Sequence, residues 1–115
     1  MKNLFTASLI LLASQISFAG KAKPDVVCIE KSTKWKYEFY FTQYNEIHIF
    51  DQSGKEMSPI DGFHVETKVL ESVPSILQYS VIQEGNMIAQ IEFRGNSKAG
   101  TGEMIDNDSL MSCRR

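Results

Sequence analysis

Apolar and polar side chains alternate through most of the chain, and the clearest example is the segment Trp35–Thr42, which has the sequence WKYEFYFT. Successive side chains of a β-strand point to opposite faces, so this period predicts a strand with one buried face. Aromatic side chains at this density bury much surface in a small domain, which favours a core role over a ligand-binding platform. The predicted core residues of this strand are Trp35, Tyr37, Phe39 and Phe41.

The same alternation recurs between short clusters of turn-forming residues, and no long segment has helical periodicity. The one segment with an alternative is 63–73, whose apolar residues also fit a short helix ended by Pro74. The predicted strands are Val26–Glu30, Trp35–Thr42, Glu46–Phe50, Glu56–Ser58, Phe63–Leu70, Ile76–Gln83, Met87–Arg94, Gly100–Ile105 and Ser109–Cys113.

The hairpin loops follow from the requirement that apolar residues of paired strands share one face. This requirement predicts three-residue loops at Gln43–Asn45, Gln52–Gly54 and Glu84–Asn86, each ending in a residue that tolerates left-handed backbone. The pairs predicted across these loops are Phe41 with Ile47, Phe39 with Ile49, Ile49 with Met57, Val81 with Ala89, Tyr79 with Ile91 and Leu77 with Phe93.

Short hairpins in succession predict an all-β fold, a single antiparallel up-and-down meander of about eight strands. Such a sheet must bury one face, either by closing on itself or by folding into two layers. We expect a small closed or nearly closed β-barrel, and a β-sandwich is the alternative.

The first residues have the pattern of a secretory signal peptide. Lys2 precedes the uncharged apolar run Leu4–Phe18, and small residues stand at the positions that signal peptidase recognises, which predicts cleavage between Ala19 and Gly20. The run is short for a membrane span, although an amino-terminal anchor is the alternative. We therefore expect residues 1–19 to be removed and residues 20–115 to form one domain of a bacterial periplasmic or secreted protein, with no membrane attachment after cleavage.

The chain has two cysteines, Cys28 and Cys113, which lie in the first and last predicted strands. An even number of cysteines in an exported protein predicts a disulfide, and two cysteines allow one pairing within a chain. Without Lys2, 11 basic and 14 acidic side chains remain, a net charge of −3. This balance argues against nucleic acid as a partner.

Five residues are candidate binding contacts. Trp35 begins its strand and is expected at one end of the core, where it could line a mouth for a small apolar molecule. On the outward parity, Tyr40 is predicted opposite His48, and Ile82 opposite Ile88. The outward apolar spots are therefore Tyr40 with Phe50 and Ile82 with Ile88. Scattered outward apolar residues are common, so these spots are either ordinary surface or part of a protein-binding face.

Motifs for catalysis, metal binding or cofactor binding are not found in the sequence. The glycine-rich run 95–102 lacks both the nucleophile elbow Gly-x-Ser-x-Gly and the ending of a phosphate-binding loop, so it is interpreted as a loop. The acidic run Asp106–Asp108 has too few ligands at fixed spacing for a calcium loop. We expect no catalytic residue, metal ligand or cofactor, and a protein that is not an enzyme.

The cleaved signal, the small all-β domain and the positions of Cys28 and Cys113 resemble the layout of bacterial periplasmic inhibitors of C-type lysozyme. That resemblance implies a small barrel that binds another protein non-covalently through a loop. The family's Ser-Gly-x-x-Tyr motif is absent, because Ser53-Gly54 is followed by Lys55, Glu56 and Met57, so no site residue is transferred. We expect a binder of an envelope or foreign protein, such as a hydrolase; a lipocalin-like carrier of a small apolar ligand is the alternative.

Overall fold

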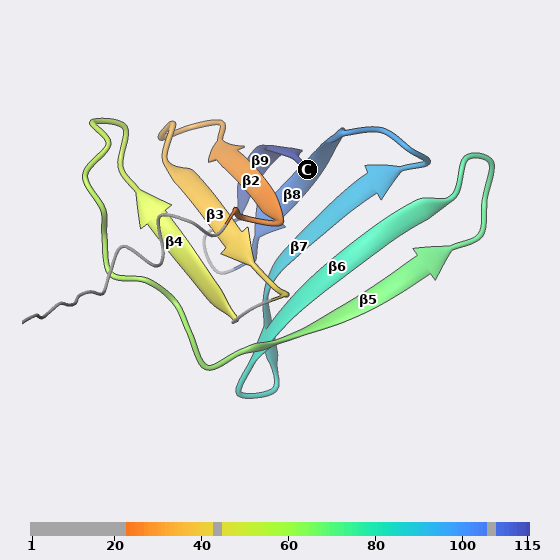
Figure 1. Cartoon of the computed structure of the whole chain (residues 1–115), viewed down its shortest axis with the longest axis horizontal. Helices are drawn as coiled ribbons and strands as arrows, with labels where there is room; N and C mark the ends of the chain where they lie inside the picture. The colour runs from red at the N-terminus through yellow and green to blue at the C-terminus, as the bar shows by residue number, and fades with distance from the viewer. Residues whose placement is uncertain (1–22, 43–44, 106–107) are drawn as a thin grey trace, which may run out of the picture.

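A computed structural model describes residues 23–42, 45–105 and 108–115, which form an all-β domain with no helix in these ranges (Figure 1). The predicted signal residues, including Ala19 and Gly20, lie outside the described part. The strands are β2 (Val26–Glu30), β3 (Lys36–Tyr40), β4 (Glu46–Phe50), β5 (His64–Leu70), β6 (Ile76–Gln83), β7 (Asn86–Arg94), β8 (Ala99–Met104) and β9 (Ser109–Arg114).

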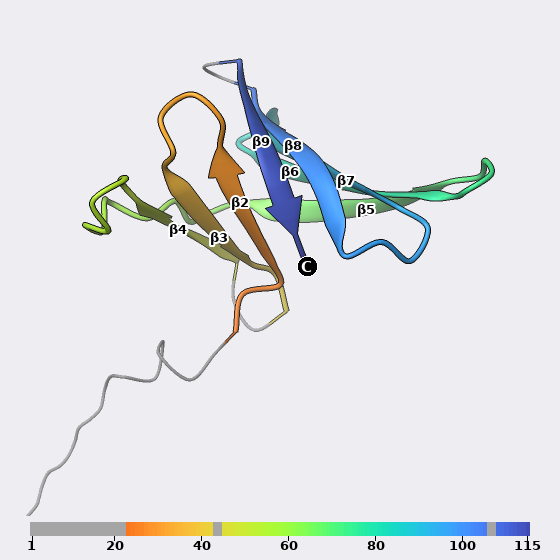
Figure 2. The same ribbon diagram turned by 90° about the horizontal axis from the view of Figure 1, so that it is seen from above.

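All eight strands belong to one antiparallel sheet with the order β4-β3-β2-β9-β8-β7-β6-β5. Strands that follow each other in the chain are neighbours except β4 and β5, while β2 pairs with β9. The meander is therefore open between β4 and β5 instead of at its termini. The sheet curls into a half-barrel, as the two views in Figures 1 and 2 show. The predicted all-β meander is confirmed.

The pairing of β3 with β4 keeps the predicted parity but is shifted by two residues. Phe39 lies opposite Ile47, which the sequence paired with Phe41. The cause is Asp25, whose carboxylate accepts hydrogen bonds from the backbone N–H groups of Phe41 (2.6 Å) and Thr42 (3.2 Å). Because these groups bond to Asp25, β3 ends at Tyr40 and the predicted three-residue loop at 43–45 is wrong.

The hairpin of β6 and β7 has the predicted pairs Val81 with Ala89, Tyr79 with Ile91 and Leu77 with Phe93, but a different loop. The loop has two residues, Glu84 and Gly85, with φ of 51° and 80°, as a turn with two left-handed residues requires. A β-bulge then adds one residue to β7, so Ile82 lies opposite Met87 rather than Ile88. The bulge restores the apolar parity that the sequence explained by a longer loop.

The loop after β4 has the predicted register. The N–H of Asp51 donates to the carbonyl of Lys55, and the N–H of Met57 donates to the carbonyl of Ile49 (2.7 Å). The predicted strand at 56–58 is wrong, because only an isolated bridge forms there, between Phe50 and Glu56. A second bridge, from Ile47 to Ile60, keeps the chain along the free edge of β4.

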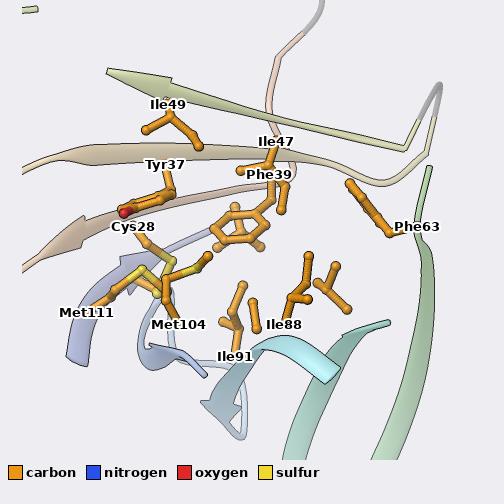
Figure 3. Packing of buried hydrophobic residues seen from close by; sticks show 14 of the residues in the cluster. Cys28, Tyr37, Phe39, Ile47, Ile49, Phe63, Ile88, Ile91, Met104 and Met111 are labelled. Atoms are coloured by element: carbon orange, nitrogen blue, oxygen red, sulfur yellow. A yellow bond between two sulfur atoms is a disulfide. The ribbon is translucent and has the colours of Figure 1, made fainter. Parts of the chain in front are cut away.

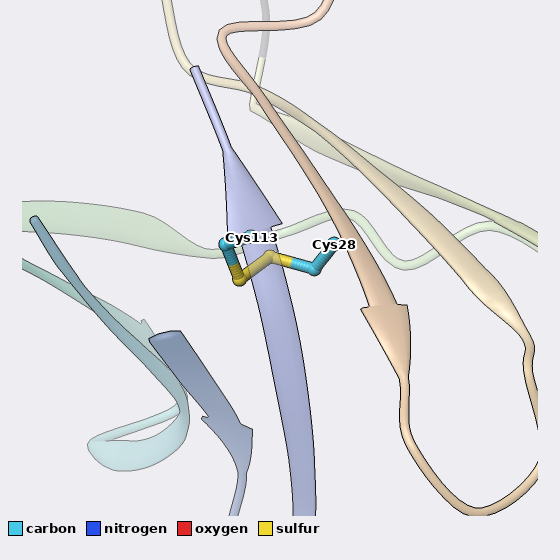
Figure 4. The surroundings of a disulfide bond; sticks show 2 residues. All are labelled: Cys28 and Cys113. Carbon is cyan, nitrogen blue, oxygen red and sulfur yellow. A yellow bond between two sulfur atoms is a disulfide. The ribbon is translucent and has the colours of Figure 1, made fainter. Parts of the chain in front are cut away.

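The core fills the inner face of the half-barrel, and the disulfide lies within it (Figure 3). Cys28 and Cys113 are directly opposite each other on β2 and β9 and form the predicted bond (Figure 4). The largest fully buried side chains come from β2, β3, β4, β6, β7 and β9. They are Phe39, Phe93, Ile47, Ile91, Met111, Val26 and Val81.

Strand β8 has glycine at two inner-face positions, Gly100 and Gly102, and this lets the sheet fold sharply. A Cβ atom on Gly100 would meet the carbonyl of Glu92 and the ring of Phe93, and one on Gly102 would lie 2.9 Å from the sulfur of Cys113. Side chains from β7 and β9 therefore close over β8 directly. In the strand order, this strand lies between β9 and β7.

Candidate functional site

Strand lengths divide the domain into two parts. The compact half, defined as β2, β3, β4 and β9, has strands of five or six residues, whereas β6 and β7 have eight and nine. At about 3.4 Å per residue, β7 is about 30 Å long and β3 about 17 Å, so the short strands cannot cover the long ones. Strands β5, β6 and β7, here called the wing, extend beyond the compact half (Figures 1 and 2).

The overhang leaves inner-face side chains of β5 and β6 uncovered. Val65 packs against the core, so the odd-numbered residues of β5 face inward. Beyond Val65, Thr67 and Val69 are exposed, and their cross-strand partners Tyr79 and Leu77 are half-buried. We define the wing surface as these four residues: Thr67, Val69, Leu77 and Tyr79.

A chain of aromatic rings joins the wing surface to the core. The Phe41 ring lies 5.9 Å from that of Phe39 and 5.3 Å from that of Tyr79, and Tyr79 meets Phe93 edge to face at 6.4 Å. Aromatic pairs at these distances add to the energy of area burial, so the wing surface has a firm base. The rings of Phe41 and Phe93 therefore hold the wing surface against the core through Tyr79.

Arg115 lies over the ring of Phe93, one of the aromatic residues of this chain of rings. Its guanidinium lies 4.6 Å from the centre of the Phe93 ring, and it donates hydrogen bonds to the carbonyls of Ser97 (2.8 Å) and Gly95 (2.9 Å). A cation over an aromatic face is attracted by the ring quadrupole. Arg115 therefore packs against a core ring that lies next to the wing surface, because Phe93 is the cross-strand partner of Leu77.

The predicted binding residues do not gather at this surface. Trp35 is half-buried and packs against the core from the compact half. Tyr40 was predicted to face outward, but it is only 7% exposed. It contacts His48 edge to face at 5.1 Å, as expected, although its direct partner across the strands is Glu46. The shift of two residues in the β3–β4 register explains the change of cross-strand partner from His48 to Glu46.

His48 forms a charged cluster on the outer face of β4. Its Nε2 lies 2.9 Å from a carboxylate oxygen of Glu46, and its Nδ1 lies 3.0 Å from one of Glu56. Both nitrogens can donate only in the imidazolium form. Burial alone would lower the pKa of His48, but the hydrogen bonds and negative charges of the two glutamates raise it above the ordinary value.

The predicted outward pair Ile82 and Ile88 is wrong for one member. Ile82 is half-buried on the outer parity of β6, but Ile88 is the extra residue of the bulge and is only 8% exposed. The carbonyl of Ile88 accepts a hydrogen bond from the N–H of Ile105 (3.0 Å), which satisfies it outside the strand ladder. The two residues therefore do not form an outward apolar patch.

A buried carboxylate, which sequence reasoning missed, lies at one end of the core. Glu30 is 2% exposed and accepts hydrogen bonds from the hydroxyls of Thr33 (2.7 Å) and Tyr37 (3.2 Å). Burial alone would raise the pKa of Glu30, but bonds from Ser109, Thr33 and Tyr37 lower it. Its position was predictable, because Glu30 shares the inward parity of Val26 and Cys28.

Burial and the charge of Glu30 raise the pKa of Tyr37 to about 12. The phenol is therefore a hydrogen-bond donor at neutral pH, and the pair anchors β2 to β3. We interpret this cluster as structural, because the hydrogen bonds of Glu30 end within the domain.

Two shallow depressions lie over the outer face of β7 and β8, on the opposite side of the sheet from the core. Glu92 lines both of them, together with Thr101. The carboxylate of Glu92 accepts a hydrogen bond from the side-chain amide of Gln78 (2.7 Å). Both depressions have a carboxylate in their lining, which the wing surface lacks.

No protein-family model, curated protein or solved structure matches this chain. Within residues 23–42, 45–105 and 108–115, no three His, Cys, Asp or Glu side chains are arranged to hold a metal ion. The same part of the chain has no helix that could span a membrane.

Proposed function

We propose that this protein acts by non-covalent binding of another protein, and that the wing surface is the contact. The observation behind the proposal is the uncovered inner face of the wing, where Val69 is 58% exposed and lies opposite Leu77. Apolar and aromatic side chains on a rigid base are typical of the centre of protein interfaces. Their exposure has no role in holding this domain together.

The packing of the interior supports protein binding over the alternative, a carrier of a small apolar ligand. A carrier needs an enclosed apolar volume. Here Phe39, Phe93 and Ile91 are fully buried side chains that occupy the inner face. A small half-barrel filled in this way leaves its apolar contact area on the wing, outside the core.

The expected partner is an envelope or foreign protein with a basic surface. After removal of the signal residues the chain has a net charge of −3, and electrostatic complementarity raises association rates and selects partners. A hydrolase such as a lysozyme is one candidate of this kind. The chain is then an exported inhibitor that covers the hydrolase without taking part in chemistry.

The test uses the disulfide-bonded chain 20–115 and two matched double variants. Val69→Ser with Leu77→Ser removes the apolar part of the wing surface. Ile29→Ser with Leu110→Ser removes two outer-face apolar residues, of which Leu110 is also 58% exposed. Each protein is added to lysozymes of different types, and cell-wall hydrolysis and direct binding are measured.

Inhibition by the parent and by the outer-face variant, with loss in the wing variant, is the expected result. Absence of inhibition for every lysozyme type would remove that partner. Thermal unfolding of each variant separates a lost contact from a lost fold. A small molecule that remains bound in native mass spectra would favour the carrier instead.

A further inference from the structure

We propose that two copies of this chain associate through strand β5, in antiparallel register about a twofold axis at Thr67. This self-association goes beyond the binding of a foreign partner proposed above. It follows from the backbone of β5, from its sequence and from the contrast between the two edges of the sheet.

The two edges differ in how they are protected. At β4, the carbonyl and N–H of Ile47 both bond to Ile60, and the carbonyl of Ile49 accepts from Met57. Strand β5 is the other end of the sheet, and no segment of the described ranges pairs with its outer side. Figure 1 shows it as the outermost strand of the wing. An exposed strand edge is a template for pairing with another strand.

The backbone groups that face outward can be identified from the ladder. The carbonyl of Ser75 accepts a hydrogen bond from the N–H of Gly95 (2.7 Å), so odd-numbered positions of this strand point to β7 and even-numbered ones to β5. Even residues of β6 pair with even residues of β5, as Ser80 does with Glu66. The odd residues of β5 therefore direct their N–H and carbonyl groups away from the sheet: Val65, Thr67 and Val69.

These three residues match themselves in an antiparallel pair centred on Thr67. Thr67 then lies opposite its own copy and Val65 opposite Val69, so all three positions form hydrogen-bonded pairs. On the inner face, Val69 then lies beside Val65 of the second copy. The two wing surfaces then join into one continuous surface.

The charged residues of β5 select this register. In the pair centred on Thr67, Glu66 lies opposite Lys68 of the second copy twice, at the closely spaced non-hydrogen-bonded positions. A shift of two residues in either direction places Glu66 opposite Glu66 or Lys68 opposite Lys68, which is unfavourable. A shift of one residue puts the outer face against the inner face. Charges that protect the edge from other strands thus permit one self-pairing.

Charge exchange between two variants tests the interface without a change of the core. Glu66→Lys and Lys68→Glu change exposed outer-face residues, and each creates like charges across the proposed axis. Sedimentation of the disulfide-bonded chain 20–115 measures dimerisation over a wide concentration range. We expect the parent to dimerise, each single variant to weaken the dimer by about tenfold, and an equal mixture of the two variants to recover it.

Thr67→Pro is the second test, because it removes an N–H that faces away from β6, a position where an edge strand tolerates proline. We expect a folded monomer with a nearly unchanged melting temperature. A parent that stays monomeric at all concentrations, or a dimer that all three substitutions leave intact, would overturn the proposal. Because Glu66 and Lys68 lie on the face opposite the wing surface, loss of dimerisation in these variants is distinguishable from loss of foreign-partner binding.

Discussion

The compact half and the wing are built from the same alternating pattern, yet only the compact half buries all the apolar residues of its inner face. In the compact half, Phe39 and Ile47 are fully buried and the disulfide joins the first and last described strands. In the wing, the same inward parity places Val69 where no strand covers it. Alternation determines which face is apolar, but strand length determines how much of that face is buried. An apolar surface left over by this mismatch is available for a partner.

The largest expected effect breaks the compact half. Replacing Cys28 and Cys113 by alanine removes a link between residues that are 85 positions apart. On the chain-entropy model this lowers the free energy of unfolding by about 4–5 kcal/mol. Urea unfolding of this double alanine variant should show a large fall in the midpoint concentration. A change below about 1 kcal/mol would mean that the compact half does not depend on this link.

Truncation of one residue in each part compares their packing directly. Phe39→Ala is expected to cost about 3–5 kcal/mol, because the ring is fully buried. Leu77→Ala in the wing is expected to cost less than half as much, because the side chain is only partly buried. Chemical unfolding of both variants under one condition gives the ratio. Equal losses would contradict the distinction between the compact half and the wing.

The buried cluster of Glu30 and Tyr37 predicts a smaller effect that depends on pH. Tyr37→Phe removes a hydrogen bond to a buried carboxylate and is expected to cost about 1.5–3 kcal/mol at neutral pH.

The pKa of Glu30 is lower in the folded state than its ordinary value of 4.5. Its stabilisation is therefore present above pH 4.5 and is lost as the pH falls through the lower folded value. Unfolding curves of the parent and of Glu30→Gln should converge in acid, and a constant difference at all pH values would exclude this role.

The smallest expected effect lies on the surface of the compact half, at His48. Its partners Glu46 and Glu56 are 37% and 50% exposed, so the cluster contributes less than about 1 kcal/mol. The folded pKa of His48 is raised above 6.5, so this contribution is present below pH 6.5 and disappears as the pH rises through the folded pKa. His48→Gln should therefore match the parent in stability at high pH and fall below it in mildly acidic solution. Protein NMR titration of the ring gives the pKa directly.

Side-chain parity made the core, the disulfide and most pairs of β6 with β7 predictable from the sequence. The β3–β4 register was not, because it depends on Asp25, a residue distant in sequence that bonds the N–H groups of Phe41 and Thr42. The bulge at Ile88 was missed for a related reason. A longer loop and a bulge give the same parity, so the pattern cannot distinguish them.

The candidate site was less predictable than the fold. Tyr40 and Ile82 interrupt the polar parity of their strands, which makes them candidates in the sequence, whereas the wing surface consists of inward residues. Alternation marks Val69 and Leu77 as core. Their exposure follows from the difference in length between β3 and β7. Only the three-dimensional arrangement separates inward residues that are covered from those that are not.

Capture from the envelope extract of the source organism tests the proposed role of the wing surface most directly. The immobilised chain 20–115 is compared with the Val69→Ser, Leu77→Ser variant and with the Ile29→Ser, Leu110→Ser variant. We expect one protein to be retained by the parent and by the outer-face variant, and to be lost from the wing variant while its fold persists. Equal retention by all three, or loss from the outer-face variant alone, would contradict binding at the wing surface.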